Sequence, residues 1–214
     1  MTTEEKTQKV LKIIERLKPV YPDAKIALDF ENPYQLLIAT ILAAQSTDVG
    51  VNKATPALFK KYPDPASLAA GTEEDIDSFI PDVNFHRNKA GLIKRAAQMI
   101  MDTYGGKVPH NMKDLDALPG VARKTANVVL SCAFGTPEGI MVDTHMIRMS
   151  NRLGLTKEKD PVKIERDLME CVPKEHWIDF PLMLILHGRH FCTAKPHTCA
   201  NCPLGDLCPD MKKG

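Results

Sequence analysis

Apolar residues recur at helical spacing along nearly the whole chain of 214 residues. In the first segment Val10, Ile13 and Leu17 share one helical face, and Thr2 with Glu5 forms a candidate capping box at its start. No stretch alternates apolar and polar residues for long enough to predict a strand. The pattern therefore predicts an all-α fold, with helices over residues 2–17, 34–44, 47–61, 72–80, 87–104, 112–118, 123–134, 145–153, 161–172 and 177–191.

Prolines set several limits of these helices. Pro33, directly after Asn32, suits the first turn of a helix. Residues 34–44 are apolar nearly all round, which is typical of a central buried helix. Pro63 and Pro65 are expected to break the chain after the helix that precedes them.

Length and charge bound the class of protein. The length allows one compact domain or two small ones that share an interface. The formal net charge is only +1, so a surface that binds nucleic acid must be a local patch and not an overall excess of charge. No apolar run approaches the ~18 residues of a membrane span, and residues 1–10 show no signal peptide. We expect an intracellular, cytoplasmic protein.

Four of the six cysteines fall within the last 23 residues, an arrangement that suggests a metal centre. Their spacing is Cys192-x6-Cys199-x2-Cys202-x5-Cys208. Tetrahedral zinc usually takes two Cys-x2-Cys pairs, and only one pair has that spacing here, whereas an iron–sulfur cluster tolerates looser spacing. The spacing favours iron–sulfur and leaves zinc, or unligated cysteines, open. The other two, Cys132 and Cys171, resemble small buried hydrophobic residues.

A short hairpin separates two of the predicted helices. Residues 118–126 read Leu-Pro-Gly-Val-Ala-Arg-Lys-Thr-Ala, and Pro119-Gly120 predicts a tight turn. The helix after the turn begins with unpaired N–H groups and the positive end of its dipole, an arrangement that suits a phosphate. The alternative is an ordinary connection between helices that binds nothing.

The surroundings of the hairpin make the pattern specific. The hairpin, the later run Val-Asp-Thr-His at 142–145 and the four cysteines together resemble the endonuclease III family of DNA repair enzymes. The agreement covers essentially the whole chain in order, because four further segments also match: Leu-Leu-Ile-Ala at 36–39, Ala-Gln-Ser-Thr-Asp at 44–48, Val-Asn-Lys-Ala at 51–54 and Leu-His-Gly-Arg at 186–189.

The resemblance implies two helical domains on either side of a DNA-binding cleft. Residues 26–136 would form a helical bundle with the helix-hairpin-helix at about 116–126, and residues 1–25 with 137–214 would form the domain that holds the metal centre. It also implies that the metal centre is a [4Fe–4S] cluster bound by the four cysteines of the C-terminal run, Cys192, Cys199, Cys202 and Cys208.

The activity that the resemblance implies is that of a bifunctional DNA glycosylase and AP lyase. Such an enzyme removes oxidised pyrimidines from duplex DNA and cuts 3′ to the abasic site by β-elimination through a lysine Schiff base. The expected partner is double-stranded DNA with oxidised pyrimidines or abasic sites, bound by a monomer that acts on the nucleoid. The competing hypotheses are a glycosylase without lyase activity and a non-catalytic DNA-binding or redox protein.

By the same resemblance, Lys124 in the hairpin helix is the catalytic lysine and Asp143 the catalytic aspartate. Taken alone, Lys124 would be a surface lysine and Asp143 a plain helix cap. The residues expected to contact DNA are Gln45, which enters the duplex, Phe85, which wedges beside it, and Gly120, Ala122, Thr125 and His145. The alternatives are a polar group at a helix end for Gln45, a core aromatic for Phe85 and a residue at a helix start for His145.

Three positions depart from the usual pattern of the family. Ala122 stands in place of the second hairpin glycine, and its β-carbon is expected to crowd a phosphate or to resist a positive φ. Asn84 stands in place of a glycine before Phe85, where we expect it to adopt a left-handed conformation. His86 stands where a tyrosine is more usual.

Overall fold

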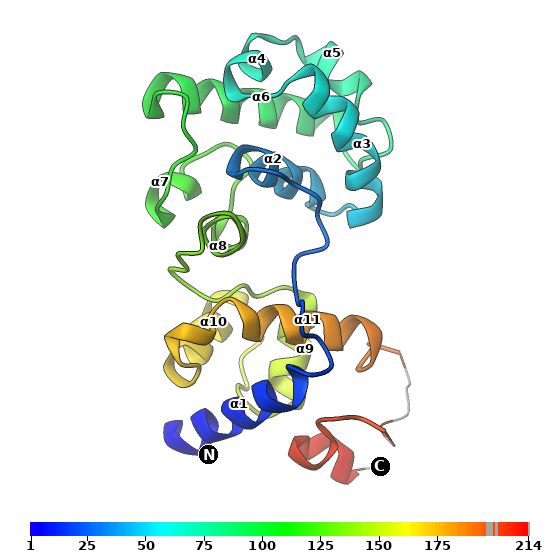
Figure 1. Ribbon diagram of the computed structural model, residues 1–214, viewed down its shortest axis with the longest axis vertical. Coiled ribbons are helices and arrows are strands. Elements are labelled where there is room, and N and C mark those ends of the chain that lie inside the picture. Colours follow the sequence, from blue (N-terminus) through cyan, green and yellow to red (C-terminus); the bar gives the residue numbers. More distant parts are fainter. Residues whose placement is uncertain (196–198, 200, 214) are drawn as a thin grey trace. The chain divides into compact units, whose positions relative to one another are not determined.

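The computed structural model describes residues 1–195, 199 and 201–213, and all regular structure in these residues is helical (Figure 1). The predicted all-α fold is therefore confirmed. No helix of this described part is long and apolar enough to cross a membrane. The α-helices are α1 (Thr3–Leu17), α2 (Pro33–Ala43), α3 (Asp48–Lys61), α4 (Pro65–Ala70), α5 (Glu73–Ser78), α6 (His86–Tyr104), α7 (Met112–Asp116), α8 (Arg123–Val129), α9 (Thr144–Arg152), α10 (Pro161–Cys171) and α11 (Asp179–His190). Shorter helical turns are η1 (Leu130–Phe134), η2 (Lys174–His176), η3 (Gly205–Leu207) and η4 (Pro209–Lys213).

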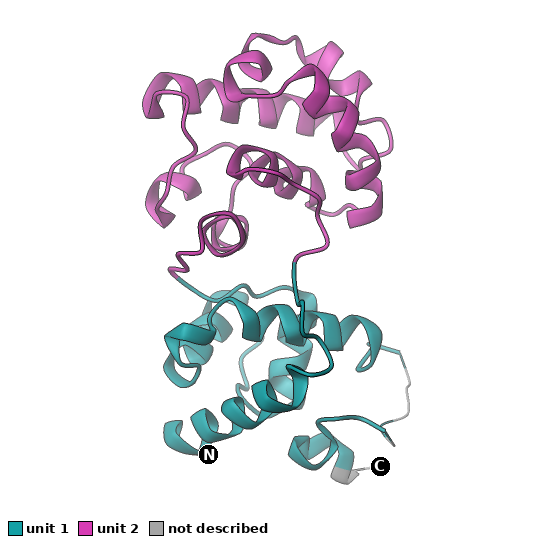
Figure 2. Cartoon of the chain, viewed as in Figure 1, with its two compact units in different colours: residues 1–25, 139–214 teal, residues 26–138 magenta. Residues whose placement is uncertain are grey.

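The chain divides into two compact units (Figure 2). One consists of residues 26–138, and the other combines residues 1–25 with residues 139–214. The divisions fall after residues 25 and 138, beside those expected after residues 25 and 136.

Helix α2 is the centre of the unit formed by residues 26–138. It contacts α3, α6 and α8, and Figure 1 shows it between α6 and α8. Leu36, Leu37 and Ile41 are almost wholly buried, because the helix is apolar on every side. The Asn32 side chain accepts a hydrogen bond from the Gln35 N–H at 3.0 Å and starts the helix. The prediction of a central buried helix is confirmed.

The prolines at 63 and 65 have different effects from those predicted. Helix α3 ends at Lys61 as expected, but Pro65 opens the further helix α4, which the sequence interpretation missed. Asp64 caps this helix by accepting a hydrogen bond from the Ser67 N–H at 2.8 Å. Proline has no N–H to lose in a first helical turn, so the same residue that ends one helix can begin the next.

Two helices of the prediction differ in their limits, and one of them is divided. The segment predicted as one helix over 123–134 changes from α8 to a wider π-helical turn, η1, at Leu130. The segment predicted over 177–191 becomes α11, which begins only at Asp179, after the separate turn η2. In both cases the type of structure is helical as predicted and the limits differ.

The second unit has its own apolar core, formed by α1, α9, α10 and α11. Helix α11 packs on α9, and α1 packs on α10 and α11. Phe180 and Ile13 lie wholly inside this core, and Cys192 and Leu204 from the C-terminal run belong to it as well. The predicted capping box is confirmed: the Thr2 hydroxyl accepts from the Glu5 N–H at 3.2 Å, and the Glu5 carboxylate accepts from the Thr2 N–H at 2.7 Å.

Candidate functional site

The hairpin between α7 and α8 turns at Gly120. This residue has a φ of 78°, in the region that favours glycine. A β-carbon at this position would lie 3.1 Å from Ile41 Cγ2 of α2 and 3.4 Å from Leu92 Cβ of α6. The turn therefore requires glycine both for its backbone conformation and for its close packing.

Ala122 has an ordinary extended conformation. Its φ is −113° and its ψ is 166°, so the expectation that its β-carbon resists a positive φ is wrong; the positive φ of the hairpin belongs to Gly120. Ala122 is the N-cap of α8 and has no side-chain group to cap the helix. Its exposed methyl group remains a candidate to crowd a phosphate.

Lys124 and Thr125 follow at the start of α8 with opposite environments. The Lys124 side chain is exposed, whereas Thr125 is buried, so a contact from Thr125 to DNA would have to come from its backbone. Lys124 therefore presents a primary amine to solvent one residue after the first residue of α8.

Asp143 is the N-cap of α9. Its Oδ1 accepts a hydrogen bond from the Met146 N–H at 2.8 Å, which fixes the carboxylate at the helix start. The residue is only half-buried, so the capping carboxylate is still partly open to solvent. The carboxylate can therefore act as a cap and as a charged group at the same time.

His145 is the second residue of α9, two positions after Asp143, and is held by Arg148. One guanidinium nitrogen of Arg148, Nη2, lies 3.1 Å from His145 Nδ1 and donates to the Gly188 carbonyl at 2.6 Å. A guanidinium only donates hydrogen bonds, so Nδ1 carries the lone pair and the proton of the neutral ring is on Nε2. The sequence interpretation did not single out Arg148, because its partners are far away in the chain.

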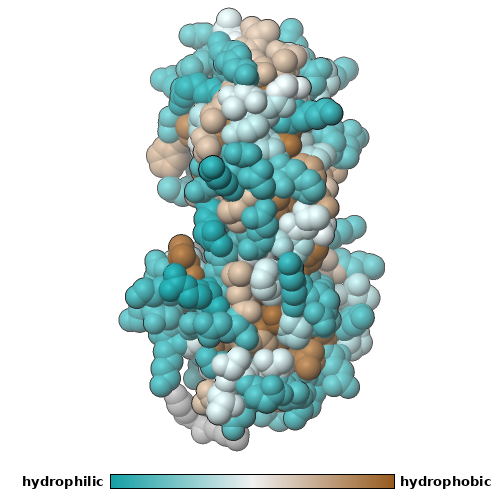
Figure 3. Space-filling model, turned by 90° about the vertical axis from the view of Figure 1, so that its left-hand side faces the viewer, coloured by the Kyte–Doolittle hydropathy of each residue, from teal (hydrophilic) through white to brown (hydrophobic). Residues whose placement is uncertain are grey.

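Gln45 and Phe85 share an unusual backbone. Their φ values are 56° and 58°, and they are the two non-glycine residues with positive φ in the described part of the chain. The Phe85 side chain is 65% exposed, so the alternative of a core aromatic is wrong. Hydrophilic residues predominate on the face seen in Figure 3. Strained, exposed residues of this kind cluster at sites that bind ligands.

Asn84 does not adopt the left-handed conformation expected of it; Phe85 does so instead. The Asn84 side-chain amide donates to the Gln45 carbonyl at 2.5 Å, and its backbone N–H donates to Ser46 Oγ at 3.0 Å. His86 pairs with Asp77 through its Nδ1. Hydrogen bonds between distant segments thus decide which residue of this loop is strained.

Lys89 lies in the first turn of α6. Its side chain is buried in the structure, and burial lowers the pKa of its ammonium group. The ammonium donates to the Leu42 carbonyl at 2.7 Å, the Ala44 carbonyl at 2.6 Å and Ser46 Oγ at 2.8 Å. The cation therefore lies at the C-terminal end of α2, where the helix dipole favours positive charge.

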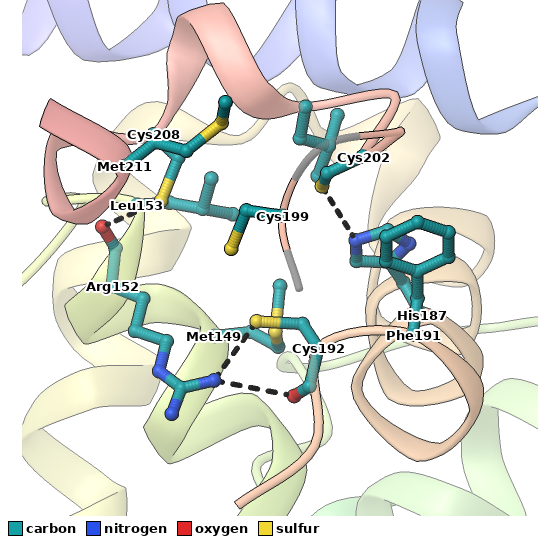
Figure 4. Close-up of a pocket in the computed structure, with 11 residues that line it drawn as sticks. Met149, Arg152, Leu153, His187, Phe191, Cys192, Cys199, Cys202, Cys208 and Met211 are labelled. Atoms are coloured by element: carbon teal, nitrogen blue, oxygen red, sulfur yellow. Dashed lines mark hydrogen bonds between the residues drawn. The ribbon is translucent and has the colours of Figure 1, made fainter. Parts of the chain in front are cut away.

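The four cysteines of the C-terminal run line one cavity (Figure 4). Apolar side chains from α9 and α11 share its wall, among them Met149, Leu153 and Phe191. In the described residues, no group of three or more side chains of metal-binding type lies close enough together to hold a single ion. The lining residues of the cavity are Met149, Arg152, Leu153, His187, Phe191, Cys192, Cys199, Cys202, Leu204, Cys208 and Met211.

Two basic side chains contact sulfur atoms at this cavity. Arg152 Nη1 donates to Cys192 Sγ at 3.0 Å, and His187 Nε2 lies 3.6 Å from Cys202 Sγ. The guanidinium of Arg152 is a cationic donor of the kind that favours a thiolate, the form of cysteine that binds metal, whereas burial raises the pKa of the Cys202 thiol. Four thiols around one largely apolar cavity, two of them contacted by basic side chains, fit an iron–sulfur cluster.

The remaining cysteines lie away from this cavity. Burial raises the pKa of the Cys132 thiol to about 11, and it also raises the pKa of the Cys171 thiol. Both environments disfavour the thiolate, in agreement with the prediction that these residues serve as small hydrophobic side chains.

Comparison with known proteins places this geometry in a family. Residues 38–174 match the model of the HhH-GPD superfamily base excision DNA repair proteins. The chain is 50% identical over 207 residues to endonuclease III of Synechocystis sp.. This match covers 97% of this chain and 94% of that protein. It is 40% identical over 205 residues to endonuclease III of Escherichia coli, with 96% and 97% covered.

Solved structures agree. A trapped covalent intermediate of endonuclease III with DNA is 41% identical and superposes with a TM-score of 0.91, covering 100% of this chain and 98% of that one. A thermostable thymine-DNA glycosylase is 25% identical, with a TM-score of 0.85 and 97% and 98% covered. The chain therefore belongs to the HhH-GPD superfamily of base excision DNA repair proteins and, within it, to the endonuclease III family.

The family assignment defines the activity. The protein is a DNA glycosylase and AP lyase of base excision repair. Proteins of the endonuclease III family carry a [4Fe–4S] cluster.

Proposed function

We propose that Lys124 and Asp143 perform this chemistry on duplex DNA that contains oxidised pyrimidines or abasic sites. The observation that carries the proposal is the similarity to a trapped covalent endonuclease III–DNA intermediate, combined with an exposed primary amine on the hairpin helix. A covalent intermediate needs a nucleophile, and Lys124 supplies one. We expect the monomer to act on nucleoid DNA in the cytoplasm.

The proposed reaction begins at the sugar of the damaged nucleotide. Breaking the N-glycosidic bond develops positive charge at C1′, which the Asp143 carboxylate stabilises. The neutral amine of Lys124 attacks C1′, and the base leaves with the bonding electrons and takes up a proton. Loss of the amine proton and opening of the sugar ring then give an imine between Lys124 and C1′.

The imine drives the lyase step. It acidifies a proton on C2′, and removal of that proton expels the 3′ phosphate by β-elimination. Water then hydrolyses the imine and frees Lys124. Arginine cannot replace Lys124, because its delocalised guanidinium stays protonated and does not form such an imine.

The damaged base must leave the stack before Lys124 can reach C1′. We propose that Gln45 enters the vacated space and that Phe85 wedges beside it, which the exposure and strained backbone of both residues support. Gly120, Ala122 and Thr125 would approach the phosphate backbone, Thr125 through its main chain. His145 would present its Nε2–H as a hydrogen-bond donor in the base pocket.

We propose that Cys192, Cys199, Cys202 and Cys208 bind a [4Fe–4S] cluster in the domain formed by residues 1–25 and 137–214. The shared cavity supports one metal centre for the four cysteines, and membership of the endonuclease III family favours [4Fe–4S] over zinc. When bound, the cluster supplies four metal–thiolate bonds that tie the C-terminal run to the core. A brown protein with a broad visible band, in contrast to a colourless one, distinguishes iron–sulfur from zinc.

Borohydride trapping tests the proposed nucleophile. A duplex with a single abasic site is incubated with enzyme and borohydride, which reduces the imine to a stable amine. Wild type and the control Lys113→Ala, which removes another exposed lysine of the same unit, should give the covalent adduct. Lys124→Ala should give none. Trapping that persists in Lys124→Ala moves the nucleophile elsewhere.

A further inference from the structure

A single hydrogen-bond network joins the loop that carries Gln45 to the loop that carries Phe85. Its centre is Ser46 Oγ, which accepts from the Lys89 ammonium at 2.8 Å and from the Asn84 N–H at 3.0 Å. The Asn84 amide adds a direct bond to the Gln45 carbonyl. The two loops are therefore linked by side chains as well as by packing.

The network holds backbones that would otherwise relax. A left-handed conformation is unfavourable for any residue with a β-carbon, and Gln45 and Phe85 both adopt it. Each needs external contacts to keep that conformation populated. Lys89 supplies them on both sides of Gln45 in the chain, at the Ala44 carbonyl and Ser46 Oγ, and Asn84 supplies them at the Gln45 carbonyl.

Lys89 is placed to act as the fixed point of this network. The residue is only 4% exposed, and its three partners are neutral oxygens at or just beyond the C-terminal end of α2. A buried ammonium with three short hydrogen bonds cannot shift without leaving a charge unsatisfied. The end of α2 and the start of α6 are thus held in one relative position.

We propose that Lys89 and Asn84 are positioning residues that hold Gln45 and Phe85 ready to enter the DNA duplex. The inference rests on the proposed insertion of these two side chains. Pre-organised loops lose less freedom on binding, so more of the contact energy appears as affinity. Asn84 is essential to the device, because a glycine at this position has no side chain to reach the Gln45 carbonyl.

A double-mutant cycle tests the proposal. The probe is a duplex with a tetrahydrofuran abasic analogue opposite 2-aminopurine, whose fluorescence rises when it is unstacked. The variants are Asn84→Ala, the pair Gln45→Ala and Phe85→Ala (made singly and together as one background), and Asn84→Ala combined with that pair. Gln98→Ala, which removes an exposed side-chain amide on α6 outside this network, is the matched control. Lys89→Met, an apolar chain of similar length, tests the buried cation.

In the otherwise wild-type protein, Asn84→Ala should weaken duplex binding about tenfold (about 1.4 kcal/mol) and reduce the rise in 2-aminopurine fluorescence. In the Gln45→Ala/Phe85→Ala background the same change should cost less than about twofold, because neither side chain is left to position. Lys89→Met should follow the same pattern, and Gln98→Ala should bind as wild type. Because Asn84 is exposed, we expect Asn84→Ala to fold, so this variant tests the proposal even if Lys89→Met does not fold.

Equal losses from Asn84→Ala with and without the Gln45 and Phe85 side chains would overturn the positioning role, as would no loss at all. A different result identifies a failure of the proposed function. If Gln45→Ala and Phe85→Ala leave the fluorescence rise unchanged, neither side chain enters the duplex, and the positioning role falls with that assignment.

Discussion

Replacing Gly120 with alanine should destabilise the protein by about 2–5 kcal/mol, because the new β-carbon meets two separate penalties. The residue has a φ of 78°, and a left-handed conformation costs about 1–2 kcal/mol for a residue with a β-carbon. The β-carbon would also lie 3.1 Å from Ile41 Cγ2, and overpacking of this kind costs about 1–3 kcal/mol.

Gly135 provides a matched control for this prediction. Its φ is 68°, but a β-carbon there would have no atom within 4 Å. Gly135→Ala should therefore show only the conformational penalty of about 1–2 kcal/mol. The difference between the two variants isolates the packing of the hairpin against α2 and α6.

The assay is urea denaturation followed by circular dichroism, with each variant compared with wild type. Gly120→Ala should also reduce lyase activity, because a displaced hairpin moves Lys124 at the start of α8. Equal destabilisation by Gly120→Ala and Gly135→Ala would refute the reasoning, since it would show that contact with Ile41 and Leu92 costs nothing.

Three further predictions separate the roles of individual groups. Asp143→Ser keeps a capping side chain but no carboxylate, so it should retain the stability of the wild type within about 0.5 kcal/mol and lose base excision. The control Asp160→Ala removes the N-cap of α10, so it should lose about 1 kcal/mol of stability and keep base excision. Arg16, through its hydrogen bond and its charge, lowers the pKa of Asp206 in the folded protein. The stabilisation from this pair is therefore fully present above the pKa of an aspartate in the unfolded chain, about 3.9, and is lost as the pH falls through the pKa of Asp206 in the folded protein. Arg16→Gln should raise the pKa of Asp206 in an NMR titration, and an unchanged value would contradict the pairing. Cys202→Ala should lose iron and the visible band, whereas Cys171→Ala should keep both; a coloured Cys202→Ala protein would exclude this residue as a ligand.

The sequence was most informative where a local pattern sets the structure. The capping box at Thr2 and the Asn32-Pro33 start of α2 depend on neighbouring residues alone, and both are present as predicted. The start of α4 at Pro65 was missed because two closely spaced prolines were taken only as a break, although proline also suits a first helical turn.

Features that depend on distant residues were beyond the sequence pattern. Residue propensity favours Asn84 for the left-handed conformation. In the structure Asn84 forms hydrogen bonds with Gln45 and Ser46, and Phe85 adopts the left-handed conformation instead. The burial of Lys89 depends on carbonyl groups at the end of α2, more than forty positions earlier in the chain. No periodicity or motif records such partners.

The identity of the nucleophile is the central claim, and peptide mapping of the borohydride-trapped adduct tests it most directly. The wild-type enzyme is trapped on a duplex with an abasic site, digested with nuclease and protease, and analysed by mass spectrometry. The account predicts that the sugar remnant is attached to the peptide that contains Lys124. A remnant on any other lysine, or on the N-terminal amine, would contradict it.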